Sequence, residues 1–122
     1  MGTVINTVLI VDDDPAFRSL ASRIVAGLGF DVAGEVGTLA AALAAAAELR
    51  PEAALVDVGL PDGDGVTLAA QLVALPWRPR VVLTSSDPDA VTIAAAERAG
   101  ANGFLPKSDL TDGSLRRMLT GG

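Results

Sequence analysis

The sequence contains neither cysteine nor histidine. Without cysteine it can form no disulfide, and it offers no thiolate to a metal ion. Without histidine it cannot build a histidine-based catalytic triad or a histidine-ligated zinc site. Lysine is nearly missing as well, because the nine basic residues are eight arginines and Lys107. We interpret this exception as a position that needs a compact ammonium group rather than a guanidinium.

Positive charge and long apolar runs are also scarce. The net charge is -6 and the isoelectric point is near 4.4, which argues against nucleic-acid binding by this domain, because neutralising phosphates requires clustered Lys and Arg. No apolar run approaches the roughly 18 residues of a membrane span. The sequence also lacks the basic start and apolar core of a secretion signal. We therefore expect a cytoplasmic protein that makes no membrane contact.

The chain alternates short apolar runs with segments of helical periodicity. Half of its 122 residues are apolar, which suits one domain over residues 1–122 with a core of its own. Alternating strands and helices predict a parallel sheet covered on both faces, and right-handed crossovers favour the strand order 2-1-3-4-5. We expect strands at 4–11, 31–36, 53–56, 80–84 and 103–105, and helices ending near residues 28, 49, 75, 99 and 119. Phe17 begins the apolar stripe of the first of these helices, and Thr38 is expected to cap the second.

Many of the aspartates fall where helices are expected to begin. Asp14 precedes Pro15 and Asp87 precedes Pro88, so each pair is predicted to be an N-cap followed by proline in the first helical turn. Loop geometry explains most of the remaining acids. We assign to capping and solvation Asp14, Asp62, Asp64, Asp87, Asp89 and Asp112.

A different set of polar residues follows the expected strands directly. It consists of Asp12, Asp13, Asp57, Thr84 and Lys107, and in a parallel sheet these positions meet at the carboxyl edge, where α/β proteins bind ligands. Two carboxylates about 4 Å apart repel by roughly 4 kcal/mol at an effective dielectric of 20. The cluster therefore predicts a Mg2+ site beside a phosphoryl-binding pocket.

Taken singly, each of these residues has an ordinary structural explanation. Asp12 and Asp13 suit a turn, Thr84 a helix cap and Lys107 the surface, and Asp57 alone is an even choice between turn former and nucleophile. What those explanations do not predict is that all five fall at the carboxyl ends of the strands. Their joint position favours a functional site.

Four motifs, in order and spanning nearly the whole chain, closely resemble the receiver domains of two-component response regulators, most of all those that precede a helix-turn-helix output domain. The motifs are Val11-Asp12-Asp13-Asp14-Pro15, Leu55-Val56-Asp57-Val58-Gly59-Leu60-Pro61 with Gly63-Asp64-Gly65, Val82-Leu83-Thr84-Ser85, and Gly100-Ala101-Asn102-Gly103-Phe104-Leu105-Pro106-Lys107.

The resemblance implies a flavodoxin-like fold and a phosphorylation site. Asp57 would accept a phosphoryl group from a histidine kinase, a phosphotransfer protein or a small phosphodonor. Mg2+ would be held by Asp13, Asp57 and the carbonyl of Gly59, with Asp12 acting through water.

The resemblance also implies a conformational switch. Thr84 and Lys107 would hold the phosphoryl oxygens, and Phe104 would rotate inward as Thr84 moves. The readout would lie on the fourth helix, fifth strand and fifth helix, with homodimerisation on phosphorylation as one outcome. The chain would then be no conventional enzyme, since it catalyses only its own phosphorylation and dephosphorylation.

The sequence departs from the receiver pattern at two positions, and there are two alternative interpretations of its function. Ser108 follows the lysine where receivers often have proline, and Gly59 places no side chain beside the phosphoryl group, which predicts little shielding from water. One alternative is an interaction module of the same fold that works without phosphorylation. The other is a haloacid-dehalogenase-like phosphatase, which the segment after the first strand fits poorly.

Overall fold

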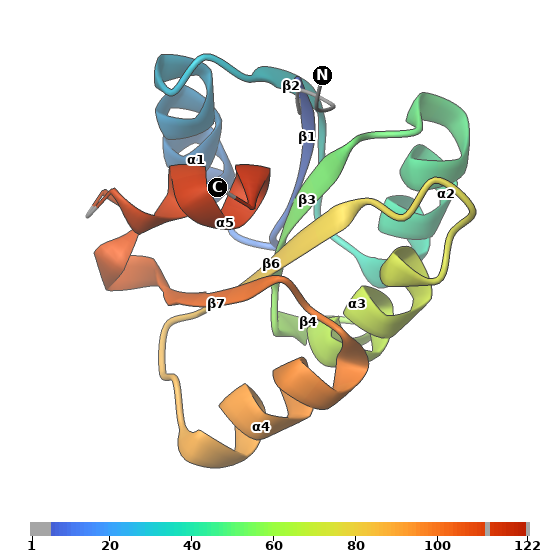
Figure 1. Cartoon of the computed structure of the whole chain (residues 1–122), viewed down its shortest axis with the longest axis vertical. Helices are drawn as coiled ribbons and strands as arrows, with labels where there is room; N and C mark the ends of the chain where they lie inside the picture. Colours follow the sequence, from blue (N-terminus) through green and yellow to red (C-terminus); the bar gives the residue numbers. More distant parts are fainter. Residues whose placement is uncertain (1–5, 112, 122) are drawn as a thin grey trace.

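The computed structural model describes residues 6–111 and 113–121, and within them a parallel sheet forms the centre of the molecule (Figure 1). Its order, β2-β1-β3-β6-β7, is the predicted 2-1-3-4-5 arrangement in chain order. The strands are β1 (Thr7–Val11), β2 (Asp31–Val36), β3 (Ala53–Asp57), β6 (Arg80–Ser85) and β7 (Gly103–Pro106).

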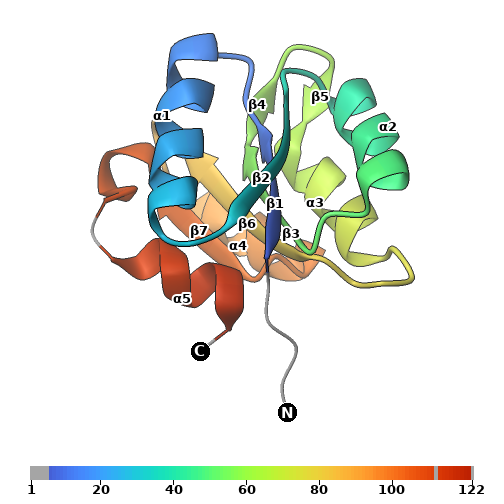
Figure 2. The same ribbon diagram turned by 90° about the horizontal axis from the view of Figure 1, so that it is seen from above.

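Helices cover both faces of the sheet, as Figure 2 shows. One face carries α1 (Pro15–Gly27) and α5 (Ser114–Thr120), and the other carries α2 (Leu39–Leu49), α3 (Gly65–Val73) and α4 (Ala90–Ala99). Each face has its own apolar core: Val8, Ile10 and Leu55 point to the first, and Leu9, Val11 and Val56 to the second. Successive residues of a central strand therefore point to opposite cores. Because both faces of these strands are buried, their sequences are continuous apolar runs.

The strands agree with the sequence expectations apart from their ends. All of β3 is buried, as its apolar run predicts. The expected first strand begins at residue 4, but residues 1–5 lie outside the described part of the chain, and β1 begins at Thr7. In β2 the pairing with β1 shifts register before Gly34, at the glycine that interrupts the apolar pattern.

Three predicted helix caps are confirmed and one is wrong. Asp14, Thr38 and Asp64 each accept a hydrogen bond from a backbone N–H in the first turn of the following helix. Before α4, however, the cap is Asp89, which accepts from the Thr92 N–H at 2.7 Å. Asp87 does not start the helix, because its N–H is bound by Ser85 Oγ in a turn that ends β6.

Two further helix boundaries differ from expectation. α3 ends at Val73 rather than at Leu75. The last helix begins at Ser114, after Gly113 in a left-handed conformation, and the Asp112 expected near its start lies outside the described residues. None of the described helices has the length and apolar character that crossing a membrane requires.

A short hairpin follows β3 that the sequence did not predict. Its strands, β4 (Gly59–Leu60) and β5 (Gly63–Asp64), pair antiparallel. Asp62 at its turn accepts hydrogen bonds from the Leu39 N–H at 2.7 Å and the Ala40 N–H at 3.0 Å. The carboxylate therefore caps α2 from another part of the chain and fastens the hairpin to that helix.

Candidate functional site

The strand order places the predicted acids side by side at the carboxyl edge of the sheet. β1 and β3 are neighbouring strands in which Val11 pairs with Val56. Asp12 directly follows β1, and Asp57 is the last residue of β3. Thr84 is the pairing partner of Asp57 on β6. Lys107 follows β7 directly, as the first residue of the 3-10 turn η1 (Lys107–Asp109).

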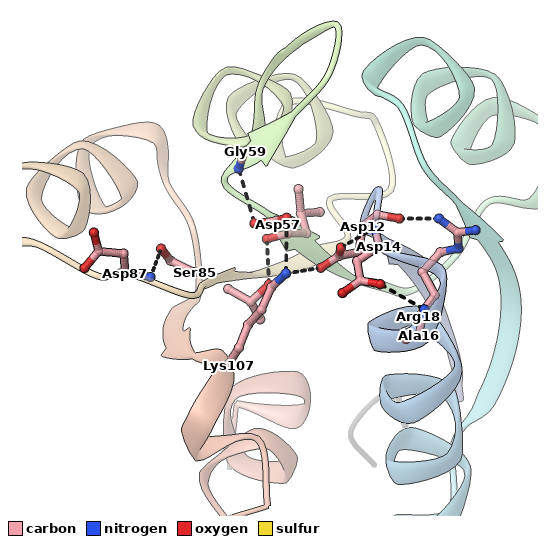
Figure 3. Close-up of polar contacts among 11 residues, drawn as sticks. Asp12, Asp14, Ala16, Arg18, Asp57, Gly59, Ser85, Asp87 and Lys107 are labelled. Carbon is pink, nitrogen blue, oxygen red and sulfur yellow. Dashed lines mark hydrogen bonds and ion pairs between the residues drawn. The ribbon is translucent and has the colours of Figure 1, made fainter.

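Lys107 reaches across this edge to two of the acids (Figure 3). Its Nζ lies 2.6 Å from Asp12 Oδ2 and 3.3 Å from Asp57 Oδ2. Asp12 is 1% exposed and Asp57 is 7% exposed, so the charges interact with little screening by solvent. Asp12 Oδ2 is enclosed and has no hydrogen-bond partner of regular geometry among the described residues, which leaves the ammonium as its compensating charge.

The surroundings of Asp57 favour its neutral form more than those of an ordinary surface aspartate. Burial raises the pKa of the Asp57 carboxyl, and the nearby Asp12 carboxylate acts in the same direction. The Gly59 N–H, which donates to Oδ1 at 3.2 Å, and the Lys107 ammonium oppose that rise. Burial works to lower the pKa of Lys107, but its pairing with Asp12 and the charge of Asp57 outweigh burial and raise it.

The loop after Asp57 is held close to the strand by a glycine. The Gly65 N–H donates to the Val58 carbonyl at 2.8 Å. A Cβ atom at residue 65 would overlap the Asp57 carbonyl oxygen, so only glycine allows α3 to begin this near to β3. The chain therefore turns sharply, and Gly59 stays beside the acids.

The acids also have the chemistry of a divalent cation site. Asp12, Asp13 and Asp57 each offer a carboxylate oxygen, and these oxygens lie within 4.8 Å of one another. Hard oxygen ligands of this kind suit Mg2+. Lys107 brings one positive charge to these three carboxylates, so negative charge is left over that a cation would compensate. The donor set therefore fits the predicted metal.

Two predicted residues lie beside the acid cluster rather than within it. Thr84 is 1% exposed, and its hydroxyl donates to the Val56 carbonyl at 3.5 Å. Phe104 is partly buried against the core on the α2, α3 and α4 face. It lines a cleft of about 320 Å³ together with Ile93 and Ala96 of α4.

Two residues of α1 reach the site although sequence reasoning did not assign them to it. The Arg18 guanidinium donates to the Asp12 carbonyl at 2.5 Å (Figure 3). The Lys107 Nζ lies 4.3 Å from the centroid of the Phe17 ring. The apolar periodicity of α1 placed Phe17 in the core but gave no sign of this contact. The proximity of Phe17 and Arg18 to the acids that precede the helix was the available signal.

Comparison with known proteins gives matches along most of the chain. A family model described as the response regulator receiver domain matches residues 8–119. The DNA-binding response regulator MtrA of Mycolicibacterium smegmatis is 35% identical over 107 residues, which are 88% of this chain and 46% of that protein. The DNA-binding transcriptional activator DevR/DosR of Mycobacterium tuberculosis is 34% identical over 117 residues, which are 95% of this chain and 53% of that protein.

The fold has close counterparts among solved structures. The signal receiver domain of the response regulator NarL from Mycobacterium tuberculosis superposes with a TM-score of 0.82 at 29% identity, over 95% of this chain and 98% of that one. The chain spans about half the length of the two curated relatives.

Proposed function

This chain belongs to the family of response regulator receiver domains, and from that membership and the geometry of its acidic pocket we propose that Asp57 accepts a phosphoryl group. The observation that carries the proposal is the Lys107 ammonium, which contacts both Asp12 and Asp57. A lone lysine among three clustered carboxylates is suited to an incoming group that carries negative oxygens. The donor would be a histidine kinase, a phosphotransfer protein or a small phosphodonor.

The transfer itself is a displacement at phosphorus. A carboxylate oxygen of Asp57 forms a bond to the phosphorus of the donor phosphohistidine, and the P–N bond breaks. The imidazole nitrogen keeps that electron pair and takes up a proton from solvent. The product is an acyl phosphate on Asp57, and Lys107 then donates hydrogen bonds to the new phosphoryl oxygens in place of the carboxylate.

Asp12, Asp13, Asp57 and the carbonyl of Gly59 would hold Mg2+ at this edge. When bound, the ion offsets the negative charge of the carboxylates and of the phosphoryl oxygens. The grouping of the three carboxylates supports this assignment. The raised pKa of Asp57, caused by its burial and by Asp12, also supports a site that gains from added positive charge.

The phosphoryl group would be read out through Thr84 and Phe104. The Thr84 hydroxyl, now directed to the Val56 carbonyl, would turn to a phosphoryl oxygen, and Phe104 would rotate into the space vacated. Because Phe104 has no hydroxyl, its rotation is governed by packing alone. The cleft that it lines with α4 supports a rearrangement of the surface formed by α4, β7 and α5.

The partners follow from the same proposal. Phosphorylation would change how the α4, β7 and α5 surface binds an output domain or a second copy of the chain. The two relatives described above are DNA-binding regulators, so an output that controls transcription is the favoured one. With a net charge of -6, the receiver itself is not the part expected to contact nucleic acid.

The deciding experiment incubates the protein with Mg2+ and acetyl phosphate and measures intact mass. Wild type is expected to gain one phosphoryl group, and Asp57→Asn is expected to gain none. Asp64→Asn is the matched control, because Asp64 is an exposed cap of α3 and asparagine caps equally well. An adduct that survives Asp57→Asn would place the reaction elsewhere. No adduct on the wild type would favour the interaction module that works without phosphorylation.

A further inference from the structure

Phe17 is the third residue of α1 and faces the acidic pocket from the helix side. It is partly buried and packs against the core under α1 and α5. Its ring centroid lies 4.3 Å from Lys107 Nζ, well within the distance of about 6 Å at which a ring face attracts an ammonium. The residue therefore belongs both to the core and to the wall of the site.

Lys107 makes two kinds of contact: its ammonium faces two carboxylates and one aromatic ring. An ammonium has three N–H donors, and the carboxylates of Asp12 and Asp57 face them at 2.6 Å and 3.3 Å. These contacts must be rearranged when a phosphoryl group arrives and takes hydrogen bonds of its own. The Phe17 ring attracts the charge as a whole through its quadrupole, so this contact does not depend on which oxygens accept the ammonium hydrogen bonds.

We propose that Phe17 is a positioning residue for the phosphorylation reaction, whose ring holds the Lys107 ammonium over the pocket while the ammonium exchanges carboxylate for phosphoryl oxygens. The inference rests on the proposed function of Asp57. The lysine side chain is 16% exposed, so the cation and the ring meet with little water between them, where such contacts are strongest. Without the ring, a flexible four-carbon stem would hold the ammonium less often in the productive position.

Simple core packing is the competing explanation for Phe17, and the choice of substitution separates the two. Phe17→Leu keeps an apolar side chain in the core and removes the ring face. Phe17→Tyr keeps the ring. Ile24→Ala, two turns further along the same helix, removes packing from the same core cluster, so it reports what a loss of packing alone does.

The first measurement is the initial rate of Mg2+-dependent phosphorylation by acetyl phosphate, at a temperature where every variant is folded. Phe17→Leu is expected to be roughly 3- to 30-fold slower than wild type. Phe17→Tyr and Ile24→Ala should keep a rate near that of wild type, although Ile24→Ala lowers the melting temperature. A wild-type rate in Phe17→Leu, or an equal loss in Ile24→Ala, would overturn the proposal.

The second measurement uses the fact that Lys107 is the one lysine of the sequence. In protein labelled with 13C- and 15N-lysine, the side chain gives a single set of resonances, and a ring face near Nζ shifts the adjacent methylene protons upfield. That shift is expected in wild type and Phe17→Tyr and should vanish in Phe17→Leu. Lysine signals that do not respond to Phe17→Leu would show that the ring does not hold the ammonium.

The two readouts also separate this inference from the proposed function. If wild type is phosphorylated on Asp57 and Phe17→Leu does not change the rate, the role proposed for Phe17 is wrong and the proposed function stands. If wild type is not phosphorylated at all, both fail, and the lysine resonances then report a contact with no part in the reaction.

Discussion

The two edges of the central sheet are built from the same strands, yet they treat their polar groups in opposite ways. At the amino edge the polar groups satisfy one another: Glu52 Oε1 accepts from the Asn6 N–H at 3.1 Å, and the Asn102 side chain accepts from the Val81 N–H at 2.8 Å. At the carboxyl edge three carboxylates lie within 4.8 Å of one another, and the Lys107 ammonium contacts two of them, Asp12 and Asp57. The polar groups named at the first edge are paired with one another, whereas the second edge carries more negative than positive charge.

This contrast separates an edge whose polar groups stabilise the fold from an edge whose charges are arranged for a ligand. At the amino edge the Asn102 side chain satisfies the N–H of the buried Val81, and losing that bond would leave a buried donor unpaired, which destabilises the fold. At the carboxyl edge the uncompensated charge is a cost to the folded chain, and a ligand that removes it is bound more tightly for that reason. Four variants, each compared with a second variant as its control, test the comparison.

The largest effect is expected from Lys107→Met, which removes the ammonium from the carboxyl edge. Asp12 is 1% exposed, so without Mg2+ the variant should lose about 3 kcal/mol of unfolding free energy, near the low end of the cost of breaking a buried ion pair. Added Mg2+ should stabilise it more than it stabilises wild type, since the ion takes over the role of the ammonium. Urea denaturation with and without Mg2+ measures both effects.

Arg23→Met is the control for Lys107→Met, because it makes the same change in net charge at an exposed position of α1. It should alter neither the stability nor the response to Mg2+. If Lys107→Met proves as stable as wild type in the absence of Mg2+, the carboxyl edge is not a site of uncompensated charge and the contrast between the edges disappears.

At the amino edge, Asn102→Ala leaves the N–H of the fully buried Val81 without its side-chain acceptor. A loss of about 1–3 kcal/mol is expected for an unsatisfied buried donor, with the rate of phosphorylation unchanged. Asn102→Asp retains a side-chain oxygen and should recover most of the loss. A slower phosphorylation of folded Asn102→Ala would mean that the two edges are not independent.

Gly59→Arg tests how open the carboxyl edge is to water. A Cβ atom at residue 59 meets no atom within 4 Å, so the variant should fold normally and place a long side chain beside Asp57. We expect phospho-Asp57 to last longer in Gly59→Arg than in wild type, with Gly59→Ala in between. A lifetime that does not respond to the arginine would remove the explanation based on shielding.

The smallest effect is expected from Asp62→Ala, which releases the hairpin from α2. The Leu39 and Ala40 N–H groups hold the pKa of Asp62 below its ordinary value, the Ala40 bond contributing most. The ionised carboxylate therefore stabilises the fold above the unfolded pKa of 3.8, and this contribution is lost as the pH falls through the lower folded value.

Thermal unfolding from neutral to acidic pH should therefore show the wild type and Asp62→Ala converging at low pH. Asp62→Asn retains an acceptor for the helix N–H groups but carries no charge, so it should keep part of the stability without that pH dependence. A difference between wild type and Asp62→Ala that is constant across the range would contradict the assignment of the charge to this cap.

Local patterns predicted most of the fold because they act over a few residues. Buried apolar runs marked the strands, and Asp14, Thr38 and Asp64 marked helix starts that are confirmed. The start of α4 was wrong because Asp87-Pro88 and Asp89 both fit a cap, and sequence alone did not distinguish a turn ending β6 from the helix after it. The cap that Asp62 gives to α2 was missed because its partners lie 22 and 23 residues away.

For the site, the sequence determined which residues could do the chemistry, since composition and order left few candidates at the ends of the strands. Asp12, Asp57 and Lys107 followed from the rule that parallel strands end at one edge. Tertiary structure decided the distances between them, the exposure of each acid and which groups contact Lys107. The Phe17 ring meets Lys107, and the Arg18 guanidinium meets the Asp12 carbonyl, because α1 packs against β1. Such contacts depend on how whole elements pack together rather than on any local pattern.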